Sequence, residues 1–544
     1  MSPAITIGVE TPDGWRELRA APAEPAPTLT EILERGGFPL NTRCGRRGLC
    51  SGCEIELRKG SLLRSGDGGR IEAGGGVRVK SCQARLAGES VELFVPPRSL
   101  LRHEPAIVSD FRVNVPWAQN PLFPSAPFGL AVDVGTTTVA LMLCDLATGR
   151  VAAQASAFNA QIRFGEDVVT RIQLCSTAPE GVPRLQRALV AETLNPLIRE
   201  ACGEAGVDPR EIGGMVVAAN TTMLHLLAGV NPRSMGVYPF SPVFLEHRTL
   251  AARRLGLEFG GDGAEIHLLP GPAAYVGADL AAGIVATGLL YDEGPAVLVD
   301  AGTNGEIIAK VGDRLVGCAT AAGPAFEGAG LLSGTRAVRG AIERVRLRAE
   351  PFEAELGIIG GGAVPLGICG SAYIDFLGEA RRAGILRPAG RFTDAFCAQA
   401  DGAIEAGELG RKLRLHPAEA SGGIWISEPD IARLLQAKAA IAAGIETLLG
   451  VLGVSAADVK ILHLAGGFGM HLSIGHAVGC GLLPGFSPQQ VQVVGNTSLG
   501  GAYLALNDRS LLEEMIAASE KMESIELNMQ PGFEDSYVSN LLLP

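Results

Sequence analysis

Four cysteines near the start of the chain have the residue type and spacing of a metal centre. Three thiols follow the pattern C-x5-C-x2-C and a fourth comes later, giving Cys44, Cys50, Cys53 and Cys82. Glycines separate the first three, and a missing Cβ lets a loop wrap a metal group and aim its N–H groups at the sulfurs. A zinc site is the alternative, but zinc usually takes two C-x2-C pairs or histidine, and no histidine lies between Gly37 and Leu101. The pattern therefore favours iron and sulfur over zinc.

Two similar turns contain the second group of residues whose types are suited to binding or catalysis. In LAVDVGTTTVALMLCDL and in VLVDAGTNGEIIAK, an apolar strand ends in an aspartate, Asp133 or Asp300, and a turn of glycine, threonine and asparagine follows. The turn residues are Gly135, Thr136, Thr137 and Thr138 in the first copy, and Gly302, Thr303, Asn304 and Gly305 in the second. Such turns present N–H groups and hydroxyls to phosphate, and the carboxylate can hold Mg²⁺. One copy alone is usually just a turn, but two copies predict two similar halves that clamp one nucleotide.

A third glycine-rich segment completes this set. The strand ILHLAGGFG runs into Gly466, Gly467, Phe468 and Gly469, where backbone can lie flat against a ligand. DVGTTT, DAGTNG and LAGGFG resemble the phosphate-1, phosphate-2 and adenosine motifs of the sugar kinase, Hsp70 and actin ATPase superfamily. The resemblance spans most of residues 128–544. It implies a two-lobed, RNase H-like ATPase that binds ATP and Mg²⁺.

The resemblance also implies roles for individual residues. Thr136, Thr137, Thr303 and Asn304 would donate to phosphate oxygens, and Gly466, Gly467 and Phe468 would bracket the adenosine. Asp133 and Asp300 would hold Mg²⁺, and Asp300 or Glu327 would orient the attacking water. Glu327, in GPAFEGAG, is either such a catalytic or metal-shell carboxylate or a surface charge.

The elements that must position these residues divide the chain into four parts. Residues 1–95 read as a small module, in which strands at Ala4–Glu10 and Trp15–Ala20 precede a short helix capped by Thr28. Residues 96–127 are a proline-rich linker whose aromatic residues pack in part on a neighbour. Residues 128–290 and 291–544 form the two ATPase lobes. Helices are expected at Pro183–Ala205, Gly277–Leu289 and Glu428–Leu449, whereas the glycine-rich stretch 66–76 is expected to be a loop.

The first module has the order of elements of a known fold. Its hairpin, helix and cysteine loop resemble the β-grasp ferredoxin fold, and its cysteine spacing is close to the C-x4-C-x2-C…C of plant-type ferredoxins, which hold a [2Fe–2S] cluster. The extra residue in the first gap resembles the adrenodoxin-like branch. The chain is therefore expected to be a multidomain α/β protein with a ferredoxin module and a two-lobed ATPase.

Composition limits the remaining function classes. The 544-residue chain has a net charge of −12, 19% charged residues and 47% hydrophobic residues, which argues against nucleic acid as the main partner. The N-terminus lacks the charged and apolar regions of a signal peptide, and no apolar run is long enough to cross a bilayer. A cytoplasmic protein without a membrane partner is expected.

The combination of a ferredoxin, a proline-rich linker and this ATPase resembles the reductive activators of corrinoid proteins. That family uses ATP to reduce a Co(II) corrinoid, bound on a separate protein, to the methyl-accepting Co(I) state. The resemblance implies an external low-potential electron donor, and we expect a homodimer through the ATPase half. Two alternatives share these motifs: an ATP-driven reductase of another partner, such as a dehydratase, and a redox-sensing ATPase or binding module. Cys369 in GICGS stands out among the other cysteines because a single thiol there would be able to bridge a cluster across a dimer.

Overall fold

The structure is a computed structural model, and its described residues form two compact units. They are residues 5–11, 14–20, 26–40, 42, 46, 48, 53–88, 90–96, 99–100, 111, 115–302, 304–362, 364–400, 402–407, 409–417, 423–466 and 472–544. Unit 1 is built around Met1–His103, and unit 2 comprises Glu104–Ala160, Asp167–Ala418 and Gly422–Pro544. Cys44, Cys50, Thr303, Gly467, Phe468 and Gly469 lie outside the described residues.

The described residues of unit 1 form a five-stranded mixed sheet, a three-stranded sheet of order β5-β4-β7, and the helix α1. The strands are β1 (Ile5–Thr11), β2 (Gly14–Ala20), β3 (Glu54–Lys59), β4 (Ser61–Arg64), β5 (Arg70–Glu72), β6 (Arg78–Lys80), β7 (Ala84–Leu86) and β8 (Val91–Phe94), with helix α1 at Leu29–Arg35. The main sheet has the order β2-β1-β8-β3-β6, in which β1 pairs antiparallel with β2 and parallel with β8. This insertion of the last strand beside the first is the β-grasp arrangement, so the expected ferredoxin fold is confirmed.

Local sequence explains the helix of this unit. The Thr28 side chain accepts from the Glu31 backbone, and Glu31 accepts from the Thr28 backbone in return, which satisfies two N–H groups at the helix start. Leu29 and Leu33 are buried in the core against the sheet. The expectation of a loop over 66–76 was wrong for Arg70–Glu72, which pairs with β4 as the short strand β5. Backbone pairing needs no buried side chain, and none of these three residues is buried.

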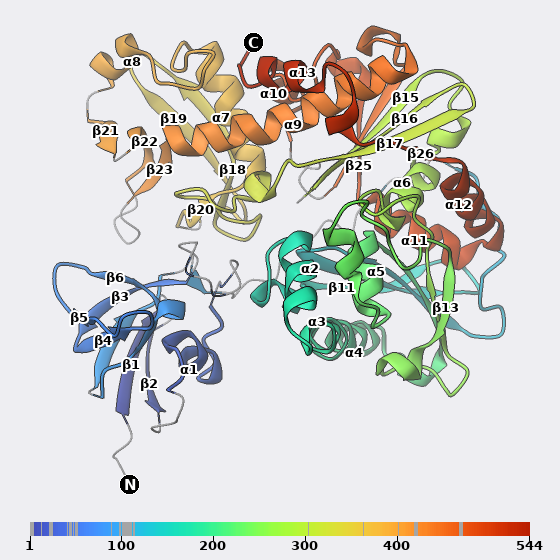
Figure 1. Ribbon diagram of the computed structural model, residues 1–544, viewed down its shortest axis with the longest axis horizontal. Helices are drawn as coiled ribbons and strands as arrows, with labels where there is room; N and C mark the ends of the chain where they lie inside the picture. Colours follow the sequence, from blue (N-terminus) through green and yellow to red (C-terminus); the bar gives the residue numbers. More distant parts are fainter. Residues whose placement is uncertain are drawn as a thin grey trace. The chain divides into compact units, whose positions relative to one another are not determined.

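Lobe 1 of unit 2 is a six-stranded sheet with helices beside it (Figure 1). Its elements are β9 (Phe128–Val134), β10 (Thr138–Asp145), β11 (Val151–Phe158), α2 (Val168–Thr177), α3 (Gly181–Leu189), α4 (Asn195–Ala205), β12 (Ile212–Ala219), α5 (Thr221–Leu227), β13 (Arg248–Ala251), β14 (Glu265–Leu268) and α6 (Ala278–Thr287). The strand order is β11-β10-β9-β12-β14-β13. The helix expected over Pro183–Ala205 is present, but a turn of π-helix at Val190–Leu194 separates α3 from α4.

Lobe 2 repeats this plan with a second six-stranded sheet. Its elements are β15 (Ala296–Ala301), β16 (Gly305–Val311), β17 (Arg314–Thr320), α9 (Glu428–Leu452), β24 (Ile461–Ala465), α10 (Ile474–Gly479), β25 (Val491–Gly495), α11 (Thr497–Asn507), α12 (Arg509–Lys521), β26 (Glu523–Ser524) and α13 (Phe533–Ser539). The order is β25-β24-β15-β16-β17-β26. In both lobes an antiparallel three-stranded meander is followed by parallel strands on the side of its first strand, which is the duplicated RNase H-like topology.

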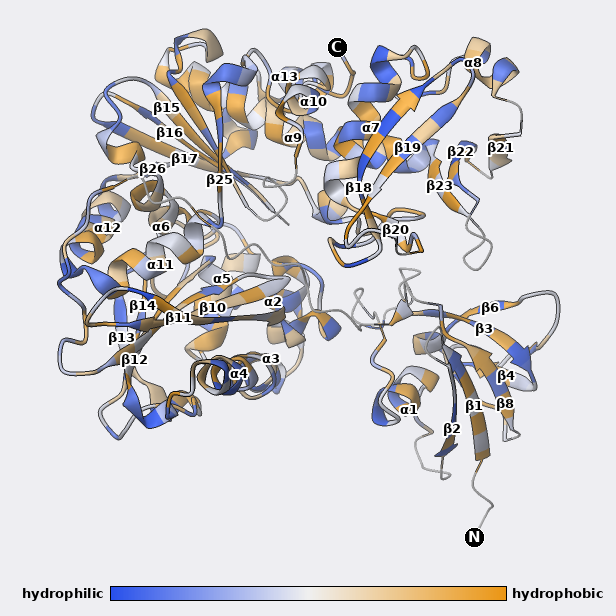
Figure 2. Cartoon of the chain, turned by 180° about the vertical axis from the view of Figure 1, so that it is seen from behind, coloured by the Kyte–Doolittle hydropathy of each residue, from blue (hydrophilic) through white to orange (hydrophobic). Residues whose placement is uncertain are grey.

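An outer subdomain is inserted into lobe 2 between β17 and α9. It contains β18 (Ala341–Arg348), β19 (Glu353–Ile358), β20 (Gly367–Ile368), α7 (Gly370–Arg382), α8 (Asp394–Gln399), β21 (Ile404–Gly407), β22 (Gly410–His416) and β23 (Ile424–Ser427). Helix α9 then runs from this subdomain along the lobe 2 sheet, and β15, β16 and β17 are predominantly apolar (Figure 2). Among the described residues, α9 is the one helix long and apolar enough to cross a membrane, but 78% of its apolar window is buried inside the protein. It is therefore a core helix.

Two helices join the lobes by crossing between their sheets (Figure 1). Helix α11 follows β25 of lobe 2 but packs on β9 and β12 of lobe 1, while α6 leads out of lobe 1 and contacts β15 of lobe 2. Helices α6 and α11 approach closely where they cross because Gly501 has no side chain. A Cβ on Gly501 of α11 would lie 2.4 Å from the Cβ of Ala282 and 2.5 Å from its carbonyl oxygen.

The described part of the linker packs on unit 2, as expected from its aromatic residues. Phe111 and Trp117 contact Tyr503 of α11, with ring centroids 5.6 and 5.9 Å apart. Phe123 lies against Gly214 of β12, where a Cβ would come within 2.1 Å of the ring. The end of the linker is thus fixed to lobe 1.

Candidate functional site

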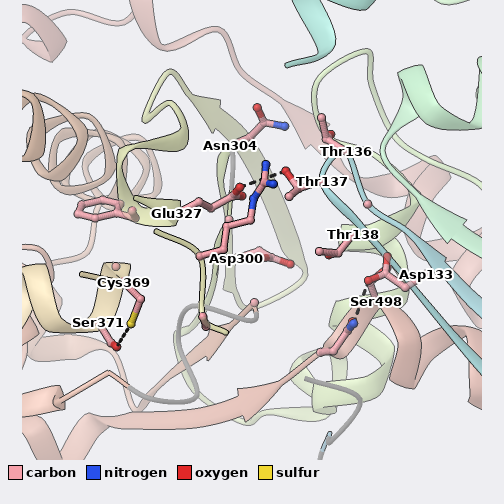
Figure 3. Close-up of a pocket in the computed structure, with 18 of the residues that line it drawn as sticks. Asp133, Thr136, Thr137, Thr138, Asp300, Asn304, Glu327, Cys369, Ser371 and Ser498 are labelled. Carbon is pink, nitrogen blue, oxygen red and sulfur yellow. Dashed lines mark hydrogen bonds between the residues drawn. The ribbon is translucent and has the colours of Figure 1, made fainter. Parts of the chain in front are cut away.

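A cavity of about 240 Å³ lies between the two lobes and gathers most of the described candidate residues (Figure 3). The sequence candidates that line it are Asp133, Gly135, Thr136, Thr137, Thr138, Asp300, Gly302, Asn304, Glu327 and Gly466. Gly305 does not line the cavity. A Cβ there would lie 2.5 Å from Thr320 Oγ1 and 2.9 Å from Ile441, so this glycine is required by packing beneath the turn.

Strand pairing explains why the two turns face the cavity. β9 and β10 are antiparallel with Val134 opposite Val139, so the turn between them sits at the strand ends. A Cβ on Gly135 would approach the Thr138 carbonyl oxygen to 2.6 Å, which only glycine avoids. β15 and β16 pair in the same way, and the Gly302 N–H donates to the Asn304 carbonyl at 3.0 Å. The predicted hairpins are confirmed.

The first turn is held by side chains from the rest of lobe 1. Asn220, which caps α5, donates through Nδ2 to Thr136 Oγ1 at 3.0 Å. Arg171, fully buried in α2, donates to the Thr136 carbonyl at 2.5 Å. Because these contacts fix both the hydroxyl and the backbone of Thr136, the turn is organised before any ligand binds.

Asp133 is a half-buried carboxylate with two donors. Asn496 donates through Nδ2 to Oδ2 at 2.9 Å, and Ser498 donates through Oγ to Oδ1 at 2.8 Å (Figure 3). Burial nevertheless raises the pKa of Asp133 because desolvation outweighs the two hydrogen bonds. Asn496 and Ser498 stand at the start of α11, so the crossing helix brings residues of lobe 2 to a lobe 1 carboxylate. The sequence analysis did not anticipate this contact.

Three further carboxylates converge on the same region. Burial, with the nearby charge of Asp133, raises the pKa of Asp300 to about 7. Burial, with the charges of Asp300 and Asp133, raises the pKa of Asp279 to about 8, and burial places the pKa of Glu306 well above its ordinary value. Carboxylate oxygens are the ligands that Mg²⁺ takes. In the part of the chain that the structure describes, however, no three of these side chains are arranged to hold a metal ion by themselves.

Asp279 and Glu306 were missed by the sequence reasoning, although each leaves a signal. Asp279 is an acid in the first turn of an otherwise apolar helix, α6. Glu306 is buried within the apolar strand β16, directly opposite Asp300 in the β15–β16 register. An acid inside a buried element needs a partner or a ligand, which makes both positions candidates.

Glu327 is half-buried and lies in the cavity wall, the place that a catalytic or metal-shell carboxylate would take. It follows lobe 2 strand β17 on a short 3₁₀ turn, Pro324–Glu327. Thr137 of lobe 1 donates through Oγ1 to Glu327 Oε2 at 3.1 Å (Figure 3). This hydrogen bond joins the two lobes across the cavity.

Cys369 also lines the cavity, at the N-cap of α7. Its sulfur lies 3.2 Å from Ser371 Oγ, and burial raises the pKa of the thiol. A buried thiol with a raised pKa stays protonated and unreactive. Six other cysteines are buried or half-buried, as expected of inert thiols: Cys144, Cys175, Cys202, Cys318, Cys397 and Cys480.

In unit 1, the described half of the cysteine set is compatible with a thiolate-held cluster. Cys53 directly precedes β3 and Cys82 follows β6, and because Glu54 pairs with Lys80, the two buried thiols stand at the same end of the sheet. Ser81 binds the Cys53 carbonyl through both its N–H, at 3.1 Å, and its hydroxyl, at 2.9 Å, which ties the two segments together. The side-chain N–H of Gln83 points at the Cys82 sulfur at 3.6 Å, the kind of contact that tunes a bound cluster.

Comparison with known proteins gives the same picture over the whole chain. Residues 128–292 match the RACo middle region, and residues 294–544 match the C-terminal domain of RACo, the ASKHA domain. The corrinoid activation enzyme RamQ of Eubacterium limosum is 28% identical, over 94% of this chain and 96% of its own length. A Co(II) methylated amine-specific corrinoid protein reductase of Methanosarcina barkeri is 26% identical over 76% of both chains.

A solved structure extends the similarity to three dimensions. The reductive activator for corrinoid, iron-sulfur protein is 30% identical, with a TM-score of 0.71, and the match covers 99% of this chain and 98% of that one. The similarity therefore includes unit 1 as well as the two lobes. On these matches, the chain belongs to the RACo family of reductive activators of corrinoid proteins.

Proposed function

We propose that this protein is an ATP-dependent reductive activator that transfers one electron to the Co(II) corrinoid of a separate protein and restores Co(I). The observation that carries the proposal is the match to a reductive activator over 99% of the chain, which takes in both the ferredoxin unit and the cavity. A dehydratase-type reductase or a sensor would share these motifs, but both curated relatives are named for activating or reducing corrinoid proteins.

In this proposal, Cys44, Cys50, Cys53 and Cys82 hold a [2Fe–2S] cluster, which supplies a one-electron carrier. The chain's own contribution is burial of Cys53 and Cys82 and the Gln83 N–H directed at the Cys82 sulfur. Burial lowers the access of water to the site, and the N–H contact adjusts its reduction potential. The electron comes from an external low-potential donor, and the reaction takes place in the cytoplasm.

The cavity between the lobes would bind ATP with Mg²⁺. Thr136, Thr137, Thr303 and Asn304 donate to phosphate oxygens in this scheme, and Gly466, Gly467, Phe468 and Gly469 lie against the adenosine. Asp133 and Asp300 hold Mg²⁺, directly or through water. Water then attacks the terminal phosphorus, the bond to the bridging oxygen breaks, and ADP and phosphate leave while Asp300 or Glu327 takes the proton from the water.

ATP is required because the electron must move uphill. Each 59 mV against a one-electron transfer costs about 1.4 kcal/mol, so an acceptor of much lower potential is rarely reduced without coupling. Nucleotide binding between two lobes changes their angle, which changes the contacts offered to the corrinoid protein. A homodimer through the ATPase half leaves unit 1 available to both the donor and the corrinoid protein.

The test is an anaerobic assay in which the protein, with its cluster reduced, is mixed with a Co(II) corrinoid carrier protein. Visible spectra are followed with and without MgATP. The proposal expects Co(I) only with MgATP, and none with Cys53→Ala or Asp300→Ala. Asp313→Asn, an exposed aspartate of lobe 2, is the matched control and retains activity. Reduction at the same rate without ATP, or a reduced cluster that yields no Co(I) with any carrier, refutes the proposal.

A further inference from the structure

Arg336 is the one basic side chain among the described residues that line the cavity. The acidic side chains in the same lining are Asp133, Asp279, Asp300, Glu306, Glu327 and Glu343. A nucleotide brings further negative charge into this wall. Arginine is well suited to a phosphate here because its planar fork donates two parallel hydrogen bonds and stays charged when buried.

Rigid backbone carries Arg336 to the cavity. The preceding residue, Thr335, donates its N–H to the Ile368 carbonyl at 2.9 Å, and the Ile368 N–H donates to the Ser333 carbonyl at 2.8 Å. Gly334 lies so close to Gly328 that a Cβ would come within 1.9 Å of the Gly328 carbonyl oxygen. These contacts fix Arg336 relative to the turn that bears Glu327, so little ordering is required when a ligand arrives.

The Arg336 side chain reaches from lobe 2 to the phosphate-binding turn of lobe 1. Its guanidinium carbon lies 4.8 Å from the centre of the Phe158 ring. Phe158 is the last residue of β11 and is the register partner of Thr138, where the first turn ends. Arg336 therefore contacts lobe 1 at Phe158, the strand position that pairs with the last residue of the first turn.

The position along a bound nucleotide follows from the same geometry. Gly466, Thr138 and Phe158 all line the cavity, and in the proposed site the adenosine lies against Gly466 while the phosphates lie at the two turns. We assign the terminal phosphate to the first turn, near Thr138 and Phe158. The cation–π contact between Arg336 and the Phe158 ring is weak by itself, whereas a bidentate arginine–phosphate pair is strong. A terminal phosphate would displace the guanidinium from the ring.

We propose that Arg336 is a phosphate-binding residue that recognises the terminal phosphate of ATP, exchanging Phe158 of lobe 1 for that phosphate. This inference rests on the proposed ATP site. It makes Arg336 the residue by which lobe 2 distinguishes ATP from ADP. Without the nucleotide, Arg336 contacts Phe158 of lobe 1. With ATP bound, it contacts the terminal phosphate instead.

The test compares the affinities of MgADP and of magnesium with a non-hydrolysable ATP analogue, by calorimetry on the full-length protein. Arg336→Ala should weaken the triphosphate by roughly 10- to 100-fold and ADP by less than about threefold, because a hydrogen-bonded charge pair is lost with one ligand only. Arg336→Lys should give an intermediate loss. Arg339→Ala, an exposed arginine on the same segment, is the matched control and should change neither affinity.

A second variant tests the exchange and guards against a folding defect. Phe158→Leu removes the competing ring, so the triphosphate should bind roughly two- to fivefold more tightly. Equal losses for the two nucleotides with Arg336→Ala, or no loss for either, would overturn the proposal. Weaker triphosphate binding by Phe158→Leu would overturn the exchange. Failure of the unmodified protein to bind either nucleotide would instead contradict the ATP site itself.

Discussion

Replacing Asp279 by asparagine should make the nucleotide-free protein more stable. Asp279 is half-buried in the cavity near Asp133 and Asp300, and these charges add to desolvation. The amide of asparagine has the same shape, carries no charge, and can still accept the Leu280 N–H that Asp279 Oδ1 accepts at 3.0 Å. The substitution therefore removes a cost without opening a cavity.

The size of the effect follows from the raised pKa. The pKa of Asp279 rises from 3.8 to about 8 in the folded protein, so the folded state binds the proton more tightly than the unfolded state. The contribution of Asp279 to the free energy of unfolding is fully present below pH 3.8 and is lost as the pH rises toward 8. At pH 7 the interval above 3.8 is about 3 units, which at 1.36 kcal/mol per unit sets a ceiling of about 4 kcal/mol. Solvent screening of the partly exposed Asp279 lowers the expected gain to roughly 2 kcal/mol.

The assay is thermal unfolding in EDTA at pH 5 and pH 8, following the transition of unit 2. For a unit of this size, the expected gain raises Tm by roughly 2 to 4 °C at pH 8 and by much less at pH 5. Asp313→Asn, on an exposed turn of lobe 2, is the control and should leave Tm unchanged at both pH values. The same Asp279→Asn variant should gain less from added MgATP than the unmodified protein does.

Two results would refute this reasoning. If Asp279→Asn is no more stable than the unmodified protein at pH 8, then the charge of Asp279 does not lower the free energy of unfolding. If the gain is equal at pH 5 and pH 8, then it does not come from the charge.

Three further predictions concern other parts of the chain. Cys53→Ser should abolish the visible absorption of a reconstituted cluster, whereas Cys369→Ser should retain it, as absorption spectra after anaerobic reconstitution will check. The two ring nitrogens of His476 lie 2.8 Å from Asp375 and 2.9 Å from Glu379, and these carboxylates raise the pKa of the imidazole. The contribution of His476 to the free energy of unfolding is therefore fully present below pH 6.5 and is lost as the pH rises through the folded-state pKa. His476→Gln should therefore lower the free energy of unfolding by about 1 kcal/mol at pH 6 and by less at pH 9 in urea titrations; an equal loss at both would contradict this. Gly501→Ala should destabilise by about 1 to 3 kcal/mol, since its methyl group meets Ala282, and unchanged urea unfolding would contradict the tight crossing.

The sequence was sufficient to predict the two hairpins because their signals are local. An aspartate that ends an apolar strand, followed by a glycine turn, specifies both the turn and the group it presents. The helix α9 and the cap of α1 were likewise predictable from residues adjacent in the chain. The β-grasp fold followed from the order of its elements.

The missed site residues come from contacts between distant segments. Asn496 and Ser498 reach Asp133 only because α11 crosses to lobe 1, and nothing adjacent to them in sequence indicates that partner. Arg336 lies in a segment without periodic pattern, and its place beside Phe158 depends on how the two lobes face each other. Such placements belong to the tertiary structure and leave no short-range signal.

The glycine crossing of α6 and α11 determines how the lobes can move. Gly501 and Ala282 lie so close that the two helices cannot approach further without a clash. We therefore expect a relative motion of the lobes to be a rotation about this crossing. In a rotation, displacement grows with distance from the pivot. Asp133 is hydrogen-bonded to the start of α11, close to this crossing. A small displacement at Asp133 would therefore produce a larger displacement in the parts of unit 2 that lie farther from the crossing.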